Sequence, residues 1–232
     1  MTKRKLARFA EMKTFPNVIE PGFNEIFNKE YKLKGKWAGE FFENDKPVVL
    51  ELGCGKGEYT VNLAKENTER NYLGIDIKGA RMWKGAKMAL EQNLPNAAFL
   101  RTRIDFIVSF FAENEIDEIW VTFPDPQPKK ARKRLVSSMF LSRYQQFLKP
   151  NGIVNLKTDN TDLFLYADEL VKANNLKVVH SSLDVHGSED KSLEMTRKIK
   201  TFYEKQFIEQ NKSIKYLAFE LDKNKKLTEP DE

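Results

Sequence analysis

The sequence is poor in the residues and runs that several protein classes require. It has one cysteine, Cys54, so it cannot form a disulfide framework within the chain, and we expect a cytoplasmic protein. Its two histidines, His180 and His186, together with that cysteine, do not make a recognisable metal-binding cluster. No run of about 18 apolar residues predicts a membrane span, and none follows the basic N-terminus as in a secretory signal. We therefore expect neither a metal nor a membrane partner.

What the sequence does contain suits one α/β domain. Of its 232 residues, 41% are hydrophobic, which is enough to bury a full core. Strand-like and helix-like patterns alternate, which predicts a mostly parallel seven-stranded sheet with helices on both faces and an antiparallel last strand at the edge. The expected strands lie near 48–52, 72–77, 97–101, 118–123, 152–158, 176–182 and 214–221, and the expected helices near 59–67, 79–92, 104–113, 137–148, 161–174 and 197–211.

Composition divides the chain into three parts. Residues 1–40 form an arm that is first basic and then aromatic, and part of it could be disordered. Residues 41–222 hold the predicted sheet, and residues 223–232 form a charged tail. The basic residues of the arm are Lys3, Arg4, Lys5, Arg8 and Lys13, and its aromatic residues are Phe9, Phe15, Phe23, Phe27 and Tyr31.

The most informative segment is VVLELGCGKGEYT, which runs from Val48 to Thr60. An apolar strand ends there in Glu51, three glycines follow at Gly53, Gly55 and Gly57, and a helical pattern begins at once. Glycines allow a sharp turn and a close approach of the backbone to a ligand. A strand, a glycine loop and a helix N-terminus together predict a nucleotide-sized cleft at the carboxyl edge of the sheet.

The residues of this loop favour one nucleotide class over others. The third glycine comes too early for the dinucleotide pattern G-x-G-x-x-G, and no G-K-[ST] phosphate cradle is present. Acidic residues at both ends, Glu51 and Glu58, would repel a pyrophosphate but suit the cationic nucleoside S-adenosylmethionine. Asp76, at the end of the next expected strand, could accept hydrogen bonds from both ribose hydroxyls. The alternative is a purely structural turn.

A second motif, WVTFPDPQPKKARKR, runs from Trp120 to Arg134. Asp125 lies between Pro124 and Pro126 at the carboxyl end of an expected strand, where reacting groups gather in this topology. Five positive charges follow within six residues: Lys129, Lys130, Arg132, Lys133 and Arg134. Alone, this run could be a solvated surface. Beside a cleft for a methyl donor, it favours a nucleic acid as the substrate.

These motifs together resemble those of the bacterial tRNA (guanine-N7)-methyltransferase family, over nearly the whole chain. The matching pieces are LELGCGKGEYT, GIDIKGAR, FPDPQPKK, LKTDN and the T-x-Y-E segment at 201–204. The resemblance implies a class I, Rossmann-like methyltransferase fold and transfer of a methyl group from S-adenosylmethionine to N7 of a guanine in the tRNA variable loop. It also implies site residues. Glu51, Gly53, Gly55, Asp76 and Asp125 would bind the cofactor, with Asp125 also at the reaction centre, and Lys129, Asp159, Thr201 and Glu204 would contact tRNA.

The chain departs from the family pattern at two places. Gln127 stands where the family usually has tryptophan, and the basic segment is shorter and lacks a histidine, so tRNA could be positioned differently there. The family also places an Asp-Ala pair near the end of the third strand, where it contributes a cofactor-binding acid. Arg103 falls at that place here, and Asp105, two residues later, is the candidate acid.

The expected chemistry needs little acid or base catalysis. Guanine N7 carries a free lone pair, so what the reaction needs is in-line placement and stabilisation of the positive charge that forms on the ring. We expect Asp125, with Asp159 or Glu204, to accept hydrogen bonds from guanine N1 and N2, which selects guanine over adenine.

Some of these residues also have structural explanations. Asp159 could simply cap the next helix, and Thr201 and Glu204 lie three apart, as in an intrahelical contact. We expect the three tryptophans, the two histidines and Cys54 to be packing or surface residues without a catalytic role.

Two other functions remain open. One is a methyltransferase of the same fold that acts on a small molecule or a protein, and the other is a non-catalytic RNA-binding module. Labelled S-adenosylmethionine given tRNA or a metabolite extract would test the first, and calorimetry with S-adenosylhomocysteine the second. The chain could act as a monomer or as a homodimer.

Overall fold

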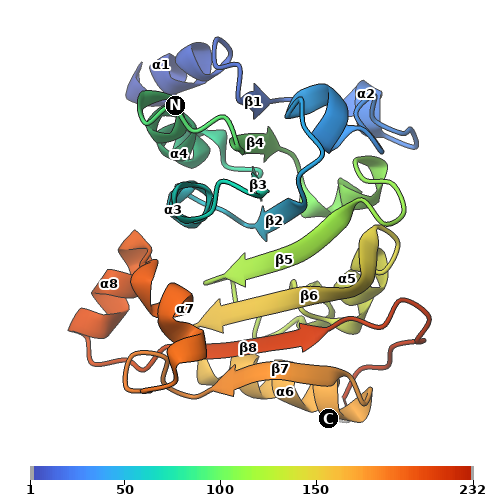
Figure 1. The fold of residues 1–232 in the computed structure, drawn as a ribbon, viewed down its shortest axis with the longest axis vertical. Helices are drawn as coiled ribbons and strands as arrows, with labels where there is room; N and C mark the ends of the chain where they lie inside the picture. Colours follow the sequence, from blue (N-terminus) through green and yellow to red (C-terminus); the bar gives the residue numbers. More distant parts are fainter. Residues whose placement is uncertain (1–2, 231–232) are drawn as a thin grey trace. The chain divides into compact units, whose positions relative to one another are not determined.

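The structure, a computed structural model, describes residues 3–230 and their side chains from residue 5 onward. The outermost residues of the predicted arm and tail, Met1, Thr2, Asp231 and Glu232, lie outside the described residues, as do the side chains of Lys3 and Arg4. The chain forms two compact units, the first ending at Ile116 and the second beginning at Asp117 (Figure 1).

The first unit contains four parallel strands in the order β1-β4-β3-β2 (Figure 1). They are β1 (Val18–Ile19), β2 (Val48–Leu52), β3 (Asn71–Asp76) and β4 (Ala97–Arg101). Every residue of β2 is buried, as expected for a strand of a parallel sheet that is covered on both faces. Helices α3 (Glu58–Glu66) and α4 (Gly79–Glu91) pack against this sheet.

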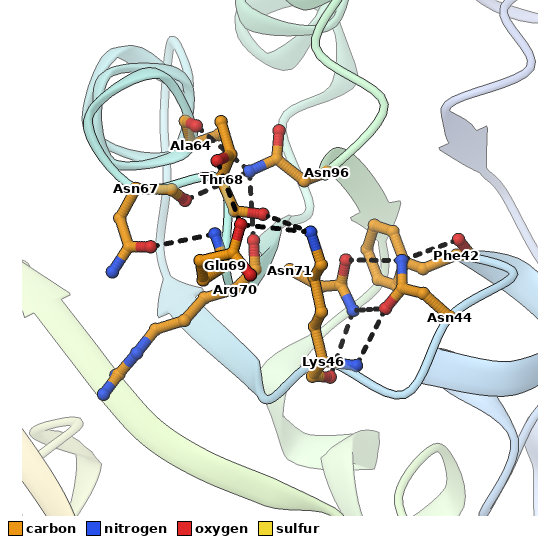
Figure 2. Close-up of polar contacts among 10 residues, drawn as sticks. All are labelled: Phe42, Asn44, Lys46, Ala64, Asn67, Thr68, Glu69, Arg70, Asn71 and Asn96. Carbon is orange, nitrogen blue, oxygen red and sulfur yellow. Dashed lines mark hydrogen bonds and ion pairs between the residues drawn. The ribbon is translucent and has the colours of Figure 1, made fainter.

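Asparagine side chains close the edge where strands β2, β3 and β4 begin (Figure 2). The Asn71 amide donates to Oδ1 of Asn44 at 2.7 Å and to the carbonyl of Lys46 at 3.1 Å. The Asn96 amide donates to three carbonyls at the end of α3 and in the loop after it, which belong to Ala64, Asn67 and Arg70. Because Asn71 and Asn96 are buried, these bonds provide the partners that their polar side chains need.

The N-terminal arm is built into the first unit. Its α1 (Lys3–Met12) packs on α4, where Glu11 accepts hydrogen bonds from Trp83 at 2.8 Å and from Lys87 at 2.9 Å. Its β1 pairs with β4. The arm continues through the short helix α2 (Phe23–Ile26) and the π-helical turn η1 (Trp37–Phe41), in which Trp37 is fully buried. Residues 3–40 therefore extend the sheet and cover α4.

The second unit contains four strands in the order β5-β6-β8-β7. They are β5 (Ile116–Thr122), β6 (Leu148–Thr158), β7 (Lys177–Ser182) and β8 (Lys215–Glu220). Strand β8 runs antiparallel to both neighbours, as predicted, but it lies between β6 and β7 rather than outermost. The outermost strand is β7, which has an irregular register between Val178 and His180.

Four helices complete the second unit: α5 (Ser138–Tyr144), α6 (Thr161–Ala173), α7 (Glu194–Lys198) and α8 (Phe202–Glu209). Helix α6 packs on β6 and β8. The C-terminal tail returns to two of these helices. Its Glu229 accepts hydrogen bonds from the Ser138 backbone at 3.1 Å and from the Tyr166 hydroxyl, and Thr228 bonds Asn174 at the end of α6.

The α/β class and the mostly parallel sheet are confirmed, with differences in detail. The described residues form eight strands, one more than the seven predicted, because the two-residue β1 carries no periodic signal. The helix predicted at 197–211 is instead two helices, since Thr201 and Glu204 form a capping box that starts α8 anew. The segment predicted as helix 104–113 forms a 3₁₀ helix, η2 (Ile104–Ser109).

Candidate functional site

In the first unit, the glycine loop at residues 53–57 joins β2 to α3. The backbone N–H groups of Gly53 and Cys54 both donate to the carbonyl of Ile75, which ties the loop to β3. Gly57, the N-cap of α3, has φ +68°, and a Cβ there would lie 2.5 Å from the Phe99 ring. Only glycine fits this position, so the start of α3 can lie close against β4.

Two carboxylates flank the glycine loop. Glu51 is only 3% exposed, and its Oε2 accepts hydrogen bonds from the Thr60 backbone at 2.8 Å and from the Thr60 hydroxyl at 2.5 Å. Asp76, at the end of β3, accepts from the Gly55 backbone at 2.9 Å and from the Lys78 backbone at 2.7 Å. The structure therefore brings together the predicted residues Glu51, Gly53, Gly55 and Asp76.

Cys54, inside the glycine loop, carries a buried thiol. Burial raises its pKa well above the usual value, and the negative charges of Glu51 and Asp76 raise it further. The thiol therefore stays protonated and acts as a small packed residue, as expected from the sequence. The same negative field is favourable for a positively charged ligand.

A cavity of about 430 Å³ lies where β3 and β4 end, within the size range of small-molecule sites. Ile77, Thr102 and Phe106 line it, together with Pro21 and Phe23 of the arm. The Thr102 hydroxyl oxygen is buried and has no hydrogen-bond partner among the described residues.

Asp105 and Arg103, the two candidates for the adenine side, form an ion pair at 3.2 Å. Arg103 lines the cavity, whereas Asp105 lies on η2 with its carboxylate toward Arg103 and is not one of the lining residues. The geometry thus places Arg103 at the cavity and pairs Asp105 with it outside the lining. The binding role expected of Asp105 stays a prediction.

In the second unit, Asp125 lies on an exposed turn, the PDP turn, formed by residues 123–127. Phe123 has φ +48° and Gln127 has φ +46°, conformations that are strained for residues other than glycine. The turn is held in this form by hydrogen bonds. Asp125 Oδ1 accepts from the Gln127 backbone at 3.1 Å, and Arg134 donates to the Pro126 carbonyl at 3.0 Å. Strain of this kind often marks a functional site.

The basic segment, residues 129–134, follows directly. Lys129, Lys130, Arg132 and Lys133 are exposed, and none of them pairs with a carboxylate in the part of the chain that the structure describes. Arg134 differs from them, since its guanidinium lies 4.2 Å from the centre of the Tyr166 ring. The first four charges are thus free to attract an anion, while Arg134 anchors the segment.

Asp159 follows β6 and is partly buried. Lys212 Nζ lies 3.4 Å from its carboxylate, and Lys215 Nζ donates to its backbone carbonyl at 3.1 Å. The alternative that Asp159 caps the next helix is wrong, because the N-cap of α6 is Asn160, whose side chain accepts from the Leu163 backbone at 2.8 Å. Helix capping therefore does not account for the presence of an aspartate at position 159.

Thr201 and Glu204 lie in a buried cluster. Thr201 caps α8, with its hydroxyl accepting from the Glu204 backbone at 3.1 Å. The Glu204 carboxylate is 0% exposed and lies 2.7 Å from Nζ of Lys157 and 2.9 Å from Nε2 of His186. Burial lowers the pKa of Lys157 to about 8, although Glu204 opposes the shift. Thr201 and Glu204 thus have structural partners, and their contact with a substrate stays a prediction.

Sequence reasoning missed two of the residues that shape these sites. Lys157 gives a recognisable signal, because a lysine within the buried strand run VNLKT must have a partner of opposite charge. Thr102, which lines the cavity, gives none, since its place there depends on the fold.

Metal sites and membrane spans have no counterpart in the described part of the chain. Between residues 3 and 230, no group of three or more acidic, histidine or cysteine side chains is placed to hold a metal ion. No helix in that range has the length and apolar character needed to cross a bilayer.

Comparison with known proteins gives a consistent result. A family described as "Putative methyltransferase" matches residues 45–217. A tRNA (guanine-N(7)-)-methyltransferase of Bacteroides thetaiotaomicron is 47% identical over 100% of this chain and 91% of its own length. A protein of the same name from Christiangramia forsetii is 48% identical over 95% of this chain and 99% of its own.

Similarity to solved structures concerns the fold. An antibiotic-related methyltransferase aligns with a TM-score of 0.59 at 18% identity and covers 78% of this chain and 90% of its own. The 16S rRNA methyltransferase KamB aligns with a TM-score of 0.58 at 18% identity and covers 76% of this chain and 88% of its own. The chain thus has the α/β fold of these methyltransferases.

Proposed function

Since the chain belongs to the tRNA (guanine-N7)-methyltransferase family, we propose that its first unit binds the methyl donor and its second unit binds the tRNA. Methylation of guanine N7 in tRNA is the activity of this family, and it is the function of this chain. We further propose, from the resemblance of its motifs, that the target guanine lies in the variable loop of tRNA.

The residues of the first unit fit S-adenosylmethionine as the donor. Asp76 keeps acceptor capacity for ribose hydroxyls, because a carboxylate has about four lone-pair sites and each of its oxygens accepts one backbone bond. A Cβ at Gly55 would meet only the Gly53 carbonyl oxygen, 3.9 Å away, so this backbone leaves room beside it for a ligand. The cavity at the ends of β3 and β4 has the size for an adenine.

Charge also favours this donor. S-adenosylmethionine supplies a methyl group on a positively charged sulfur, which N7 of guanine can attack directly. The carboxylates of Glu51 and Asp76, which flank the glycine loop, attract such a cation. Glu51 acts here mainly by holding the start of α3 and by its charge, since Thr60 occupies its Oε2.

In the second unit, we propose that Asp125 binds the guanine. N1 and N2 of guanine donate hydrogen bonds, and a carboxylate can accept both while offsetting the positive charge that develops on the ring. Asp159 is the second acid we propose near the base. Lys129 and the exposed charges after it would bind tRNA phosphates, because these cations have no carboxylate partner in the described chain.

The observation that carries this assignment is the PDP turn, where two strained residues hold Asp125 exposed just before the basic segment. It is tested by incubating transcribed tRNA with labelled S-adenosylmethionine and analysing the nucleosides. We expect 7-methylguanosine from the wild type and a kcat at least about tenfold lower for Asp125→Asn, since removing such an electrostatic partner typically has this effect.

Asp162→Asn, an exposed aspartate of the same unit, is the matched control and should keep full turnover. Calorimetry with S-adenosylhomocysteine should show that Asp125→Asn retains at least part of its donor binding. Turnover by Asp125→Asn equal to that of the control would remove Asp125 from the mechanism.

A further inference from the structure

Lys157, a residue that the proposed mechanism does not use, has all three of its donors engaged inside the second unit. Its side chain is 0% exposed, and Nζ lies 2.7 Å from Glu204 Oε1. The same nitrogen donates to the carbonyls of Thr196 at 2.5 Å and Ile199 at 3.0 Å, at the end of α7. An ammonium group has three protons, so this buried charge is fully satisfied.

Glu204 is equally enclosed. Its Oε1 contacts both Lys157 and His186, and its Oε2 accepts from the Thr201 backbone at 3.4 Å. The carboxylate is 0% exposed, so no part of it faces a substrate in this structure. Lys157 belongs to LKTDN and Glu204 to T-x-Y-E, so this ion pair joins two of the motifs that carry the family resemblance.

The backbone of Lys157 reaches the PDP turn. Its carbonyl accepts a hydrogen bond from the Phe123 backbone at 2.8 Å, at the point where β5 enters the turn. The ring of Phe123 in turn packs on Phe207 of α8, with centroids 5.8 Å apart. Helices α7 and α8 lie at the end of β6 where this happens (Figure 1). The strained residue Phe123 is thus held by β6 on one side and by α8 on the other.

The ion pair links these two supports. Lys157 carries the backbone contact with Phe123, and Glu204 sits in the first turn of the helix that supplies Phe207. A buried ion pair adds little stability over apolar residues of similar volume, although removal of one partner is strongly destabilising. What such a pair supplies here is a fixed distance and direction between β6 and α8.

We propose that Lys157 and Glu204 are positioning residues for methyl transfer, whose buried ion pair fixes the turn that carries Asp125, and that Glu204 does not itself contact tRNA. This inference rests on the proposed role of Asp125. It departs from the family-based expectation that Glu204 binds the substrate.

The test uses the double variant Lys157→Met/Glu204→Gln, which removes both charges and leaves neither one unpaired. The matched control is Lys177→Met/Glu220→Gln, which makes the same substitutions in an exposed pair between β7 and β8. Both are compared with the wild type for kcat, for KM of tRNA, for binding of S-adenosylhomocysteine and for the urea midpoint.

We expect the double variant to fold, to bind S-adenosylhomocysteine like the wild type and to keep its KM for tRNA within about twofold, while kcat falls at least about tenfold because Asp125 is misplaced. The control should match the wild type in all four measurements. An unchanged kcat in the folded double variant would overturn the proposal. So would a raised KM with kcat intact, since that result identifies Glu204 as a tRNA contact.

A second variant covers the case in which the double variant does not fold. Phe207→Leu leaves the ion pair in place and loosens only the contact of α8 with Phe123. It should lower kcat without changing donor binding, and a wild-type kcat would also overturn the proposal. Wild-type and Asp125→Asn enzymes are assayed in parallel. If Asp125→Asn is fully active, the proposed function of Asp125 fails; if only the pair variants are active, the positioning inference alone fails.

Discussion

Phe123 and Gln127, on either side of Asp125, adopt a backbone conformation that suits glycine, with φ of +48° and +46°. A positive φ costs a residue with a side chain about 1–2 kcal/mol. The turn keeps this cost because hydrogen bonds from Gln127 and Arg134 and the packing of Phe123 hold it in shape. The strained backbone lowers the stability of the turn, and in return it fixes the position of the Asp125 carboxylate.

The substitution Gln127→Gly tests this exchange at the residue scale. Glycine relieves the strain but adds backbone freedom worth about 0.5–1 kcal/mol, so the free energy of unfolding should stay the same or rise by about 1 kcal/mol. Because Asp125 is then held less firmly, we expect kcat to fall about three- to tenfold. Urea unfolding and a methylation assay measure the two effects.

Asn151→Gly is the control, since Asn151 is an exposed residue of β6 with φ +60°, and asparagine tolerates that conformation. It should change neither quantity. A fall in stability for Gln127→Gly would contradict the strain argument.

Site residues could be predicted where a local motif carries them and not where distant segments meet. The glycine loop lies where the sequence predicts, because a strand, a turn and a helix follow one another within 13 residues, from Val48 to Thr60. Asp76 does so because it ends the next apolar run, β3. The burial of Glu204 depends on Lys157, 47 positions earlier in the sequence, and no local pattern reports that pairing. Asp105 illustrates a third case, in which its partner Arg103 occupies the place beside the cavity.

At the scale of elements, the C-terminal tail connects α5 and α6 through hydrogen bonds. Glu229 accepts hydrogen bonds from the Ser138 backbone at the start of α5, from the Ser138 hydroxyl at 2.6 Å, and from Tyr166 of α6. Burial raises the pKa of Tyr166, and the contact with Glu229 raises it further. Tyr166 also supports Arg134, so the tail reaches the end of the basic segment through one side chain.

Glu229→Ala should loosen this arrangement. It removes three hydrogen bonds to a carboxylate, each worth about 1.5–3 kcal/mol when charged, but partial exposure reduces the loss to about 1–2 kcal/mol in all. We expect faster amide hydrogen exchange in residues 138–144 and a lower urea midpoint.

Glu189→Ala removes an exposed glutamate from a loop of the same unit and should leave both measurements unchanged. Equal amide exchange rates in Glu229→Ala and the wild type would show that the tail does not stabilise α5.

Prediction of the elements succeeded where periodicity is strong. Strands β2 and β4 match their expected ranges, because their apolar runs are short and bounded by turn residues. The arm at residues 1–40 was predicted, but its strand β1 and helix α2 were not, because they have two and four residues, too few for a periodic signal. The place of β8 between β6 and β7 depends on long-range pairing, which sequence alone does not encode in a readable form.

For the whole molecule, the location of charge matters more than its sum. The net charge is +5, a modest excess for a chain with 39 basic residues. Binding of a polyanion depends on how many of its phosphates the protein neutralises. Each neutralised phosphate releases a bound counterion into solution, and added salt opposes that release and so weakens binding. The exposed charges of the basic segment can supply several such contacts.

The variant Lys129→Gln/Lys130→Gln therefore should weaken tRNA binding and reduce its salt dependence. Its net charge falls from +5 to +3. We expect the slope of log Kd against log salt to decrease by about 1–2, and affinity to fall at least about fivefold at low salt. Filter binding of tRNA over a salt series measures both, and S-adenosylhomocysteine binding should not change.

Lys172→Gln/Lys177→Gln lowers the net charge by the same two units at exposed sites on α6 and β7. Its slope should equal that of the wild type. If both variants lose affinity equally, net charge rather than the basic segment governs binding.

The irregular register of β7 affects whether molecules of this protein can aggregate through the edge of the sheet. A straight outermost strand leaves a row of N–H and C=O groups that a second molecule can extend, which is how fibrils begin. In β7, the bulge between Val178 and His180 breaks that row, and Lys177 places a charge at its start. The outermost strand β7 therefore pairs poorly with a strand of a second molecule, and this disfavours aggregation through the sheet edge.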